Sequence, residues 1–274
     1  MKLYLLPNLL TCGNLGAGFY AILGALNMNF QPAALAILGA IVLDMLDGRL
    51  ARALKTTSAF GIQLDSLADL VSFGVAPAVL VYQVALYDLG RTGALIAFSF
   101  LLAAALRLAR FNVKAVEREE APPTPGSMAG PADAFQGLPS PAAAGIVAAL
   151  VLTCIAYGEL GLGAEHTRHT IGVMKRTMPF VVTAIPVVVL VAAGLMVSSV
   201  GYASFKRATL RRRAPFRVFV LILTAGLLIW RYPESSLLVL STLYLLSGLT
   251  GVVWRAYRMR RAARLEHRAV EVHS

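Results

Sequence analysis

The sequence predicts an all-α protein, a polytopic transmembrane helical bundle of about eight spans with both termini in the cytoplasm. Of its 274 residues, 58% are hydrophobic and only 14% are charged, which is less charge than a soluble domain carries. The hydrophobic residues fall in blocks of about 20, the length that a helix needs to cross the hydrocarbon core. Lys and Arg gather beside alternate blocks, as the positive-inside rule requires.

Eight hydrophobic blocks define the expected spans. In chain order they are 5–27, 32–54, 61–85, 92–113, 141–158, 178–199, 215–231 and 235–255. Prolines stand near the starts of several blocks, where a helix tolerates them. The polar, Pro- and Gly-rich stretch 114–140 is expected to be a cytoplasmic loop, and the basic stretch 256–274 a cytoplasmic tail.

Orientation follows from the basic residues. With the N-terminus inside and strict alternation, 20 of the 25 Lys and Arg residues lie on the cytoplasmic side. Three of the other five lie in the loop 159–177, so the later spans invert if this loop does not cross as expected. The net charge of +11 is explained by topology and anionic lipid headgroups. We therefore expect membrane lipids, and no nucleic acid, among the partners.

Acidic residues inside a membrane are costly and indicate function. Four of the 14 fall in one short window that joins the second and third spans: Asp44, Asp47, Asp65 and Asp69. The first two are spaced i, i+3 and the last two i, i+4, so each pair lies on one face of its helix. The basic stretch between the pairs reverses the chain, and we expect all four carboxylates to meet at the cytoplasmic ends of the two helices.

Four carboxylates in one place require a counter-charge, because their mutual repulsion is costly. Hard oxygen ligands without His or Cys favour Mg²⁺ or Mn²⁺, and such a site at a membrane surface suggests a phosphate-bearing substrate. Gly48, Ala51 and Gly61 lack bulk, so they let a nucleotide or diphosphate approach the backbone. Arg52 is placed to contact phosphate.

The window reads Asp44-x2-Asp47-Gly48-x2-Ala51-Arg52-x8-Gly61-x3-Asp65-x3-Asp69. It resembles the complete signature of the CDP-alcohol phosphatidyltransferase family. The resemblance implies a transmembrane helical fold, often a homodimer, with two divalent ions (Mg²⁺ or Mn²⁺) at the aspartates. It implies that Asp44, Asp47 and Asp65 are metal ligands, and that Asp69 is a ligand, the general base, or both.

The resemblance also divides the chain into regions and places it in a cell. Residues 1–160 would form the catalytic core, 161–255 additional spans beyond a six-span family core, and 256–274 the basic tail. It implies a bacterial inner membrane with the active site facing the cytoplasm. Gly48, Ala51, Arg52 and Gly61, together with Asn8 and Thr11 of the first span, are assigned to binding of the CDP-lipid.

Three further stretches resemble the branch of the family whose acceptor is serine. They are the segment with Asn8, Thr11 and Asn14, the end of the fourth span with Arg107, Arg110 and Asn112, and residues 135–145. A serine carboxylate needs a cation, and arginine offers it a two-pronged donor. Arg110, Arg107 and Asn112 are therefore the expected acceptor-binding residues. The arginines have two other interpretations, as contacts to the donor diphosphate or as topology charges that reach the interface.

The reaction that the resemblance implies converts CDP-diacylglycerol and L-serine into a phosphatidylserine and CMP by direct displacement, with Asp69 as base. One alternative keeps this chemistry with another acceptor, glycerol 3-phosphate or an inositol phosphate. A distant alternative is a cation-coupled transporter. A transporter predicts acidic residues at mid-membrane on several separate helices, whereas these lie at the ends of two consecutive spans.

Overall fold

The structure is a computed structural model that describes residues 5–54, 58–120, 137–159 and 179–198, together with Ser236 and Val239. Within these residues every regular element is helical and no strand is present. The all-α prediction is confirmed for this part of the chain. The expected spans 215–231 and 235–255 (apart from Ser236 and Val239), the tail 256–274 and most of the expected loops lie outside it.

The observed helices follow the hydrophobic blocks closely. They are α1 (Leu5–Leu26), α2 (Phe30–Leu54), α3 (Ala59–Leu70), η1 (Val71–Val75), α4 (Ala76–Val81), η2 (Tyr82–Leu86), η3 (Tyr87–Leu89), α5 (Gly90–Glu120), α6 (Ser140–Glu159) and α8 (Pro179–Val197). The third expected span is thus one rod running from α3 to η3, interrupted by the π-helical turns η1 and η2.

One boundary prediction was wrong. The polar stretch that begins at 114 was expected to be a loop, but α5 continues to Glu120. The sequence Lys-Ala-Val-Glu-Arg-Glu-Glu at 114–120 consists mostly of strong helix formers, and these extend the helix once it has left the apolar block. Polarity alone therefore did not mark the end of this helix.

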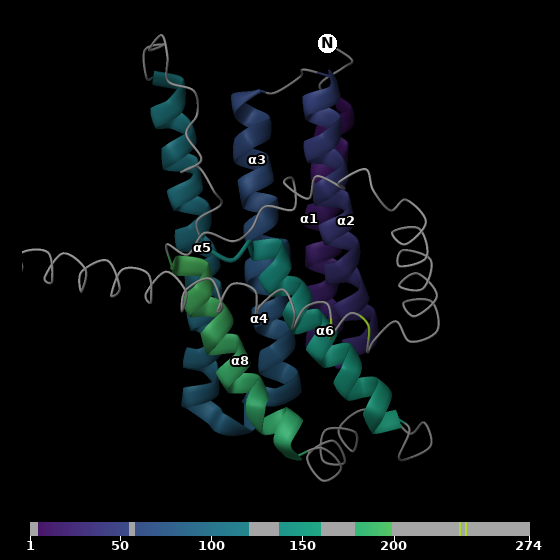
Figure 1. Cartoon of the computed structure of the whole chain (residues 1–274). Coiled ribbons are helices and arrows are strands. Elements are labelled where there is room, and N and C mark those ends of the chain that lie inside the picture. Colours follow the sequence, from purple (N-terminus) through teal and green to yellow (C-terminus); the bar gives the residue numbers. More distant parts are fainter. Residues whose placement is uncertain are drawn as a thin grey trace, which may run out of the picture.

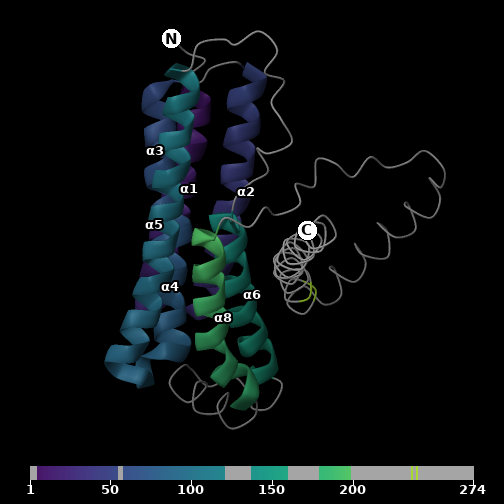
Figure 2. The same cartoon turned by 60° about the vertical axis from the view of Figure 1, so that its left-hand side comes forward.

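The helices alternate in direction and pack side by side (Figures 1 and 2). α1 contacts α2, α3, η1 and α4, so it joins the two helices that carry the aspartates. α6 and α8 cover only the half of the bundle away from the N-terminus, where α8 packs against α5 and α6 against α2. The site described below lies near the level at which α6 begins and α8 ends.

Small side chains let α1 and α2 approach closely. Ala21 and Ala25 of α1 and Ala33 of α2 are fully buried. A Cβ added to Gly24 would lie 3.1 Å from the Cβ of Ala33. Alanine and glycine at such contacts are typical of helices that pack by van der Waals contact in lipid.

The turn between α1 and α2 is closed by a Schellman motif. The Asn29 N–H donates to the Gly24 carbonyl at 2.8 Å, and the Met28 N–H donates to the Ala25 carbonyl at 3.2 Å. Met28 stands at the position that is usually glycine, with φ of 62°. A side chain there is strained, because the left-handed region brings Cβ against the following carbonyl.

Among the residues that the structure describes, two helical segments are long and apolar enough to cross a membrane, Pro7–Leu26 and Phe60–Val113. Ser140–Ala156 and Thr183–Val197 are shorter apolar helices. α2 carries charged residues through its last three turns, which lowers its hydropathy. The structure therefore supports a membrane protein, while the count of eight spans and the orientation stay predictions.

Candidate active site

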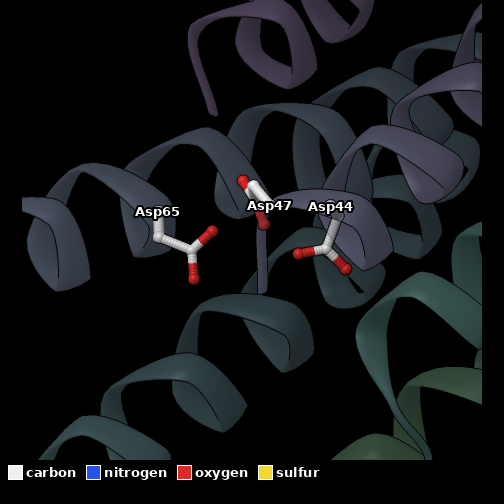
Figure 3. Close-up of side chains that lie close together, drawn as sticks. All are labelled: Asp44, Asp47 and Asp65. Carbon is white, nitrogen blue, oxygen red and sulfur yellow. The ribbon is translucent and has the colours of Figure 1, made fainter. Parts of the chain in front are cut away.

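Three of the predicted aspartates come together between α2 and α3 (Figure 3). Asp44 and Asp47 lie one turn apart on α2, and Asp65 faces them from α3. One carboxylate oxygen from each lies within 4.8 Å of the other two. Asp47 is buried, and Asp44 and Asp65 are half-buried. The i, i+3 spacing on α2 and the chain reversal after it produce this group.

The residues present fit a divalent metal ion. All three side chains offer hard oxygen donors, the kind that Mg²⁺ and Mn²⁺ prefer. Asp65 Oδ1 is buried and has no hydrogen-bond partner among the described residues. A buried carboxylate oxygen without a donor is costly unless a cation compensates it. The geometry and the unpartnered oxygen together support a metal site at this group.

Asp69 lies beside this group and outside it. It follows Asp65 by one turn of α3, and its carboxyl group interacts electrostatically with Asp44 and Asp65. Its Oδ1 accepts a hydrogen bond of 3.2 Å from Asn14 Nδ2 of α1. Asp69 is thus held by α1 through Asn14, at a position next to the three-carboxylate group.

α1 supplies two side chains that hold the aspartates. The hydroxyl of Thr11 lies 2.9 Å from Asp47 Oδ2 and 3.1 Å from the Pro7 carbonyl. Asn14, one turn further along, is fully buried and contacts Asp69. Sequence analysis assigned Thr11 to the CDP-lipid and gave Asn14 no role. The signal that indicates both is the i, i+3 spacing of three polar residues, Asn8, Thr11 and Asn14, in a helix that is otherwise mostly apolar.

The small residues of the signature line the same region. Gly48 and Ala51 follow Asp44 and Asp47 by four residues each, so they continue that face of α2. Gly61 donates its N–H to the Ser58 hydroxyl, which caps α3, at 3.0 Å.

Asn8 of α1 reaches this same turn. A Cβ on Gly61 would lie 3.1 Å from Ser58 Oγ and 3.3 Å from Asn8 Oδ1, so this turn has little room for a side chain. Arg52 belongs to α2, and its side chain lies outside the described part of the structure.

The expected acceptor-binding residues are bonded to neighbouring helices. Arg107 Nη1 donates to the Ser140 hydroxyl at the start of α6, at 2.8 Å. Arg110 donates from Nη1 to the Val197 carbonyl at 3.1 Å and from Nη2 to the Ser198 carbonyl at 3.5 Å, so it binds the C-terminal end of α8. An arginine there satisfies carbonyls that the helix leaves without partners.

Asn112 and Ser66 bond to each other across α5 and α3, with Asn112 Nδ2 3.0 Å from Ser66 Oγ. Ser66 is the residue after Asp65. The segment before α6 also meets α8, because the Leu138 N–H donates to the Leu195 carbonyl at 2.9 Å. The end of α5, the start of α6 and the end of α8 therefore form one bonded assembly, joined to α3 through Asn112.

Comparison with known proteins adds to this geometry. A sequence model described as CDP-alcohol phosphatidyltransferase matches residues 4–174. The chain is 34% identical over 247 residues to a CDP-diacylglycerol–serine O-phosphatidyltransferase of Helicobacter pylori, covering 90% of each chain. It is 44% identical over 109 residues to the enzyme of the same name from Bacillus subtilis, covering 40% of this chain and 62% of that one. It is also 36% identical over 159 residues to an archaetidylserine synthase of Methanothermobacter thermautotrophicus, covering 57% of this chain and 60% of the relative.

Proposed function

The chain belongs to the CDP-alcohol phosphatidyltransferase family, and from this premise we propose that it transfers the phosphatidyl group of CDP-diacylglycerol to L-serine, giving phosphatidylserine and CMP. The observation that carries the proposal is the group formed by Asp44, Asp47 and Asp65, whose carboxylates converge on one point. Serine as acceptor is supported by the names of relatives that differ in their lipid but share a serine headgroup.

Asp44, Asp47 and Asp65 would hold the divalent ion, Mg²⁺ or Mn²⁺, and with a second ion Asp69 would join them as a ligand. When bound, the metal supplies positive charge to the diphosphate and to the CMP leaving group. Thr11 acts through Asp47, because its hydroxyl contacts Oδ2 of that carboxylate. The donor is proposed to lie along Gly48 and Ala51, where small side chains leave the backbone accessible, with Gly61, Asn8 and Arg52 at its edge.

The transfer is proposed to occur in one displacement. Asp69 takes the proton of the serine hydroxyl, and the hydroxyl oxygen forms a bond to the phosphorus that carries diacylglycerol. The bond from that phosphorus to the bridging oxygen breaks, and CMP leaves with the electron pair. Asp69 suits the role of base because it lies next to the three-carboxylate group yet has its own hydrogen-bond partner in Asn14.

The acceptor is proposed to enter from the side of α5. Arg110 donates to the carbonyls at the end of α8, and its guanidinium group is proposed to bind the serine carboxylate from there. Arg107 and Asn112 lie at the same end of α5. The alternative acceptors, glycerol 3-phosphate and inositol phosphate, carry a phosphate that the same arginines would bind.

The proposal also covers the placement and assembly of the chain. We place it in a bacterial inner membrane, with the active site facing the cytoplasm, and as a homodimer. Residues 1–160 form the catalytic core, 161–255 further spans and 256–274 the tail. The bonds from Arg110 to the end of α8 indicate that the core needs at least the first of these further spans for its acceptor side.

The test is an acceptor panel with the purified full chain in detergent. We expect CDP-diacylglycerol with Mn²⁺ or Mg²⁺ to release CMP on addition of serine and to yield a lipid with the mass of phosphatidylserine. Ethanolamine, which has no carboxylate, should react poorly, and so should glycerol 3-phosphate and inositol phosphate. If glycerol 3-phosphate or inositol phosphate gave its lipid product faster than serine gives phosphatidylserine, serine would not be the preferred acceptor and that part of the proposal would be wrong. Failure to release CMP with any acceptor would overturn the transferase proposal.

A further inference from the structure

We propose that Asn14 is a positioning residue for Asp69, and that α1 thereby sets the orientation of the base. The inference rests on the proposed function, because it takes Asp69 as the base. Asn14 is fully buried within a helix of otherwise apolar character, and its Nδ2 donates to Asp69 Oδ1 at 3.2 Å. The contact is to one carboxylate oxygen, so it restrains the position of the carboxylate and leaves Oδ2 for the hydroxyl of the acceptor.

The backbone of Asn14 is itself held in place. The Ser72 hydroxyl donates to the Asn14 carbonyl at 2.9 Å. One turn further along α1, a Cβ added to Gly18 would lie 2.7 Å from Ser72 Cα, closer than any side chain tolerates. α1 and the π-helical turn that follows Asp69 are therefore pressed together. This contact fixes the register between Asn14 and Asp69, since Ser72 lies only three residues beyond Asp69.

The amide oxygen of Asn14 indicates that this residue is not present for packing alone. Asn14 Oδ1 is buried and has no hydrogen-bond partner among the described residues. An unpartnered buried acceptor is destabilising, and a leucine of similar size would avoid that cost. The amide is therefore disfavoured as packing, and its donor to Asp69 is the contact that accounts for it.

α1 contacts two different parts of the site, and this makes the inference testable. Thr11 contacts Asp47, which belongs to the proposed metal group, whereas Asn14 contacts Asp69, the proposed base. Loss of the Thr11 hydroxyl should affect metal binding. Loss of the Asn14 amide should affect turnover, because a misplaced base slows the transfer step without removing a metal ligand.

The experiment compares Asn14→Leu, Thr11→Val and Thr153→Val in the full chain. Thr153 is the matched control, because it is a buried polar residue of α6 whose hydroxyl donates to the Ala149 carbonyl. The readouts are CMP release with the best acceptor of the panel, the KM for CDP-diacylglycerol, Mn²⁺ affinity by calorimetry and thermal unfolding in detergent. Asn14→Ser, whose side chain is too short to reach Asp69, is measured in parallel in case the leucine variant does not fold.

We expect Asn14→Leu and Asn14→Ser to lower kcat by about 10- to 100-fold, the effect of one lost hydrogen bond to a charged group. Mn²⁺ affinity and the KM for CDP-diacylglycerol should change by less than about threefold. Thr11→Val should give the reverse pattern, and Thr153→Val should match the wild type. In an Asp69→Asn background the Asn14 substitution should have little further effect on kcat, because no base remains to be positioned.

Three results would overturn the inference. They are a kcat for both Asn14 variants like that of Thr153→Val, a parallel loss of Mn²⁺ affinity and kcat, and an undiminished effect of Asn14→Leu in the Asp69→Asn background. Full activity of Asp69→Asn alone would instead refute the assignment of the base in the proposed function. The two failures are therefore distinguishable.

Discussion

At the scale of single residues, the four aspartates of α2 and α3 belong to one sequence motif but have different surroundings. Asp44, Asp47 and Asp65 share one centre, and Asp69 is bonded to α1 beside it. The spacing within each helix was enough to predict which aspartates share a face. The contacts of Thr11 and Asn14 with the aspartates were not predicted, because a contact between helices depends on their rotation and depth, which spacing along one helix does not specify.

The converging carboxylates lead to a prediction about metal. Asp44→Asn, Asp47→Asn and Asp65→Asn should each lose most CMP release, because each replaces a charged ligand by a neutral one. EDTA should abolish the activity of the wild type, and Mn²⁺ or Mg²⁺ should restore it. Asp88→Asn is the matched control, since Asp88 is exposed at the far end of the α3–η3 rod. Full activity in a metal-free preparation would contradict this prediction.

Arg110 leads to a second prediction at this scale, and the structure sharpens it. If its guanidinium group binds the serine carboxylate, Arg110→Ala should raise the serine KM by about 10- to 100-fold, and Arg110→Lys should recover only part of the loss. The KM for CDP-diacylglycerol should change little. Because Arg110 also binds the end of α8, thermal unfolding of each variant must be measured beside the kinetics. If Arg110→Ala lowered the stability and left the serine KM unchanged, Arg110 would cap α8 without binding the acceptor.

At the scale of elements, hydrophobic blocks predicted six helices to within a few residues. The expected 5–27 and 141–158, for example, are Leu5–Leu26 and Ser140–Glu159. Two features escaped this reasoning. The π-helical turns η1 and η2 were not predicted, because no residue type marks such a turn; Gly18 of α1 lies close against η1. The extension of α5 to Glu120 shows that a helix can continue through a charged segment after its apolar block has ended.

The turn between α1 and α2 carries a prediction about stability. Met28→Gly should raise the stability of the protein by about 1 kcal/mol, because glycine adopts the left-handed conformation without the steric cost that methionine bears. Thermal unfolding in detergent measures the effect, with Asn27→Gly as the control at the neighbouring position of the same turn. CMP release should stay unchanged, since this turn lies at the end of the bundle opposite the aspartates. A loss of stability in Met28→Gly would mean that the contacts of the methionine side chain outweigh the strain.

At the scale of the whole molecule, the alternation of helices was predictable, and the positions of the helices along one another were not. A hydrophobic block specifies that a helix crosses the membrane, but not where along its neighbours it lies. α6 and α8 begin and end near the level of the aspartates, and the bonds of Arg107 to Ser140 and of Arg110 to Val197 and Ser198 fix them there. Those bonds join residues far apart in the chain, so they became visible only in the folded structure.

The same alternation yields the prediction on which the cellular role depends. If the basic residues orient the chain as proposed, the turn before α3 faces the cytoplasm and the turn after α1 faces outward. The test needs a background without native cysteines, Cys12→Ser with Cys154→Ser, because Cys12 is exposed. In intact cells an impermeant thiol reagent should label Asn29→Cys and leave Thr57→Cys unlabelled until the membrane is opened. Thr57 is chosen over Ser58 because Ser58 caps α3. Labelling of Thr57→Cys in intact cells would place the aspartates on the outer face, away from a cytoplasmic supply of CDP-lipid and serine, and the proposed function would fail with it.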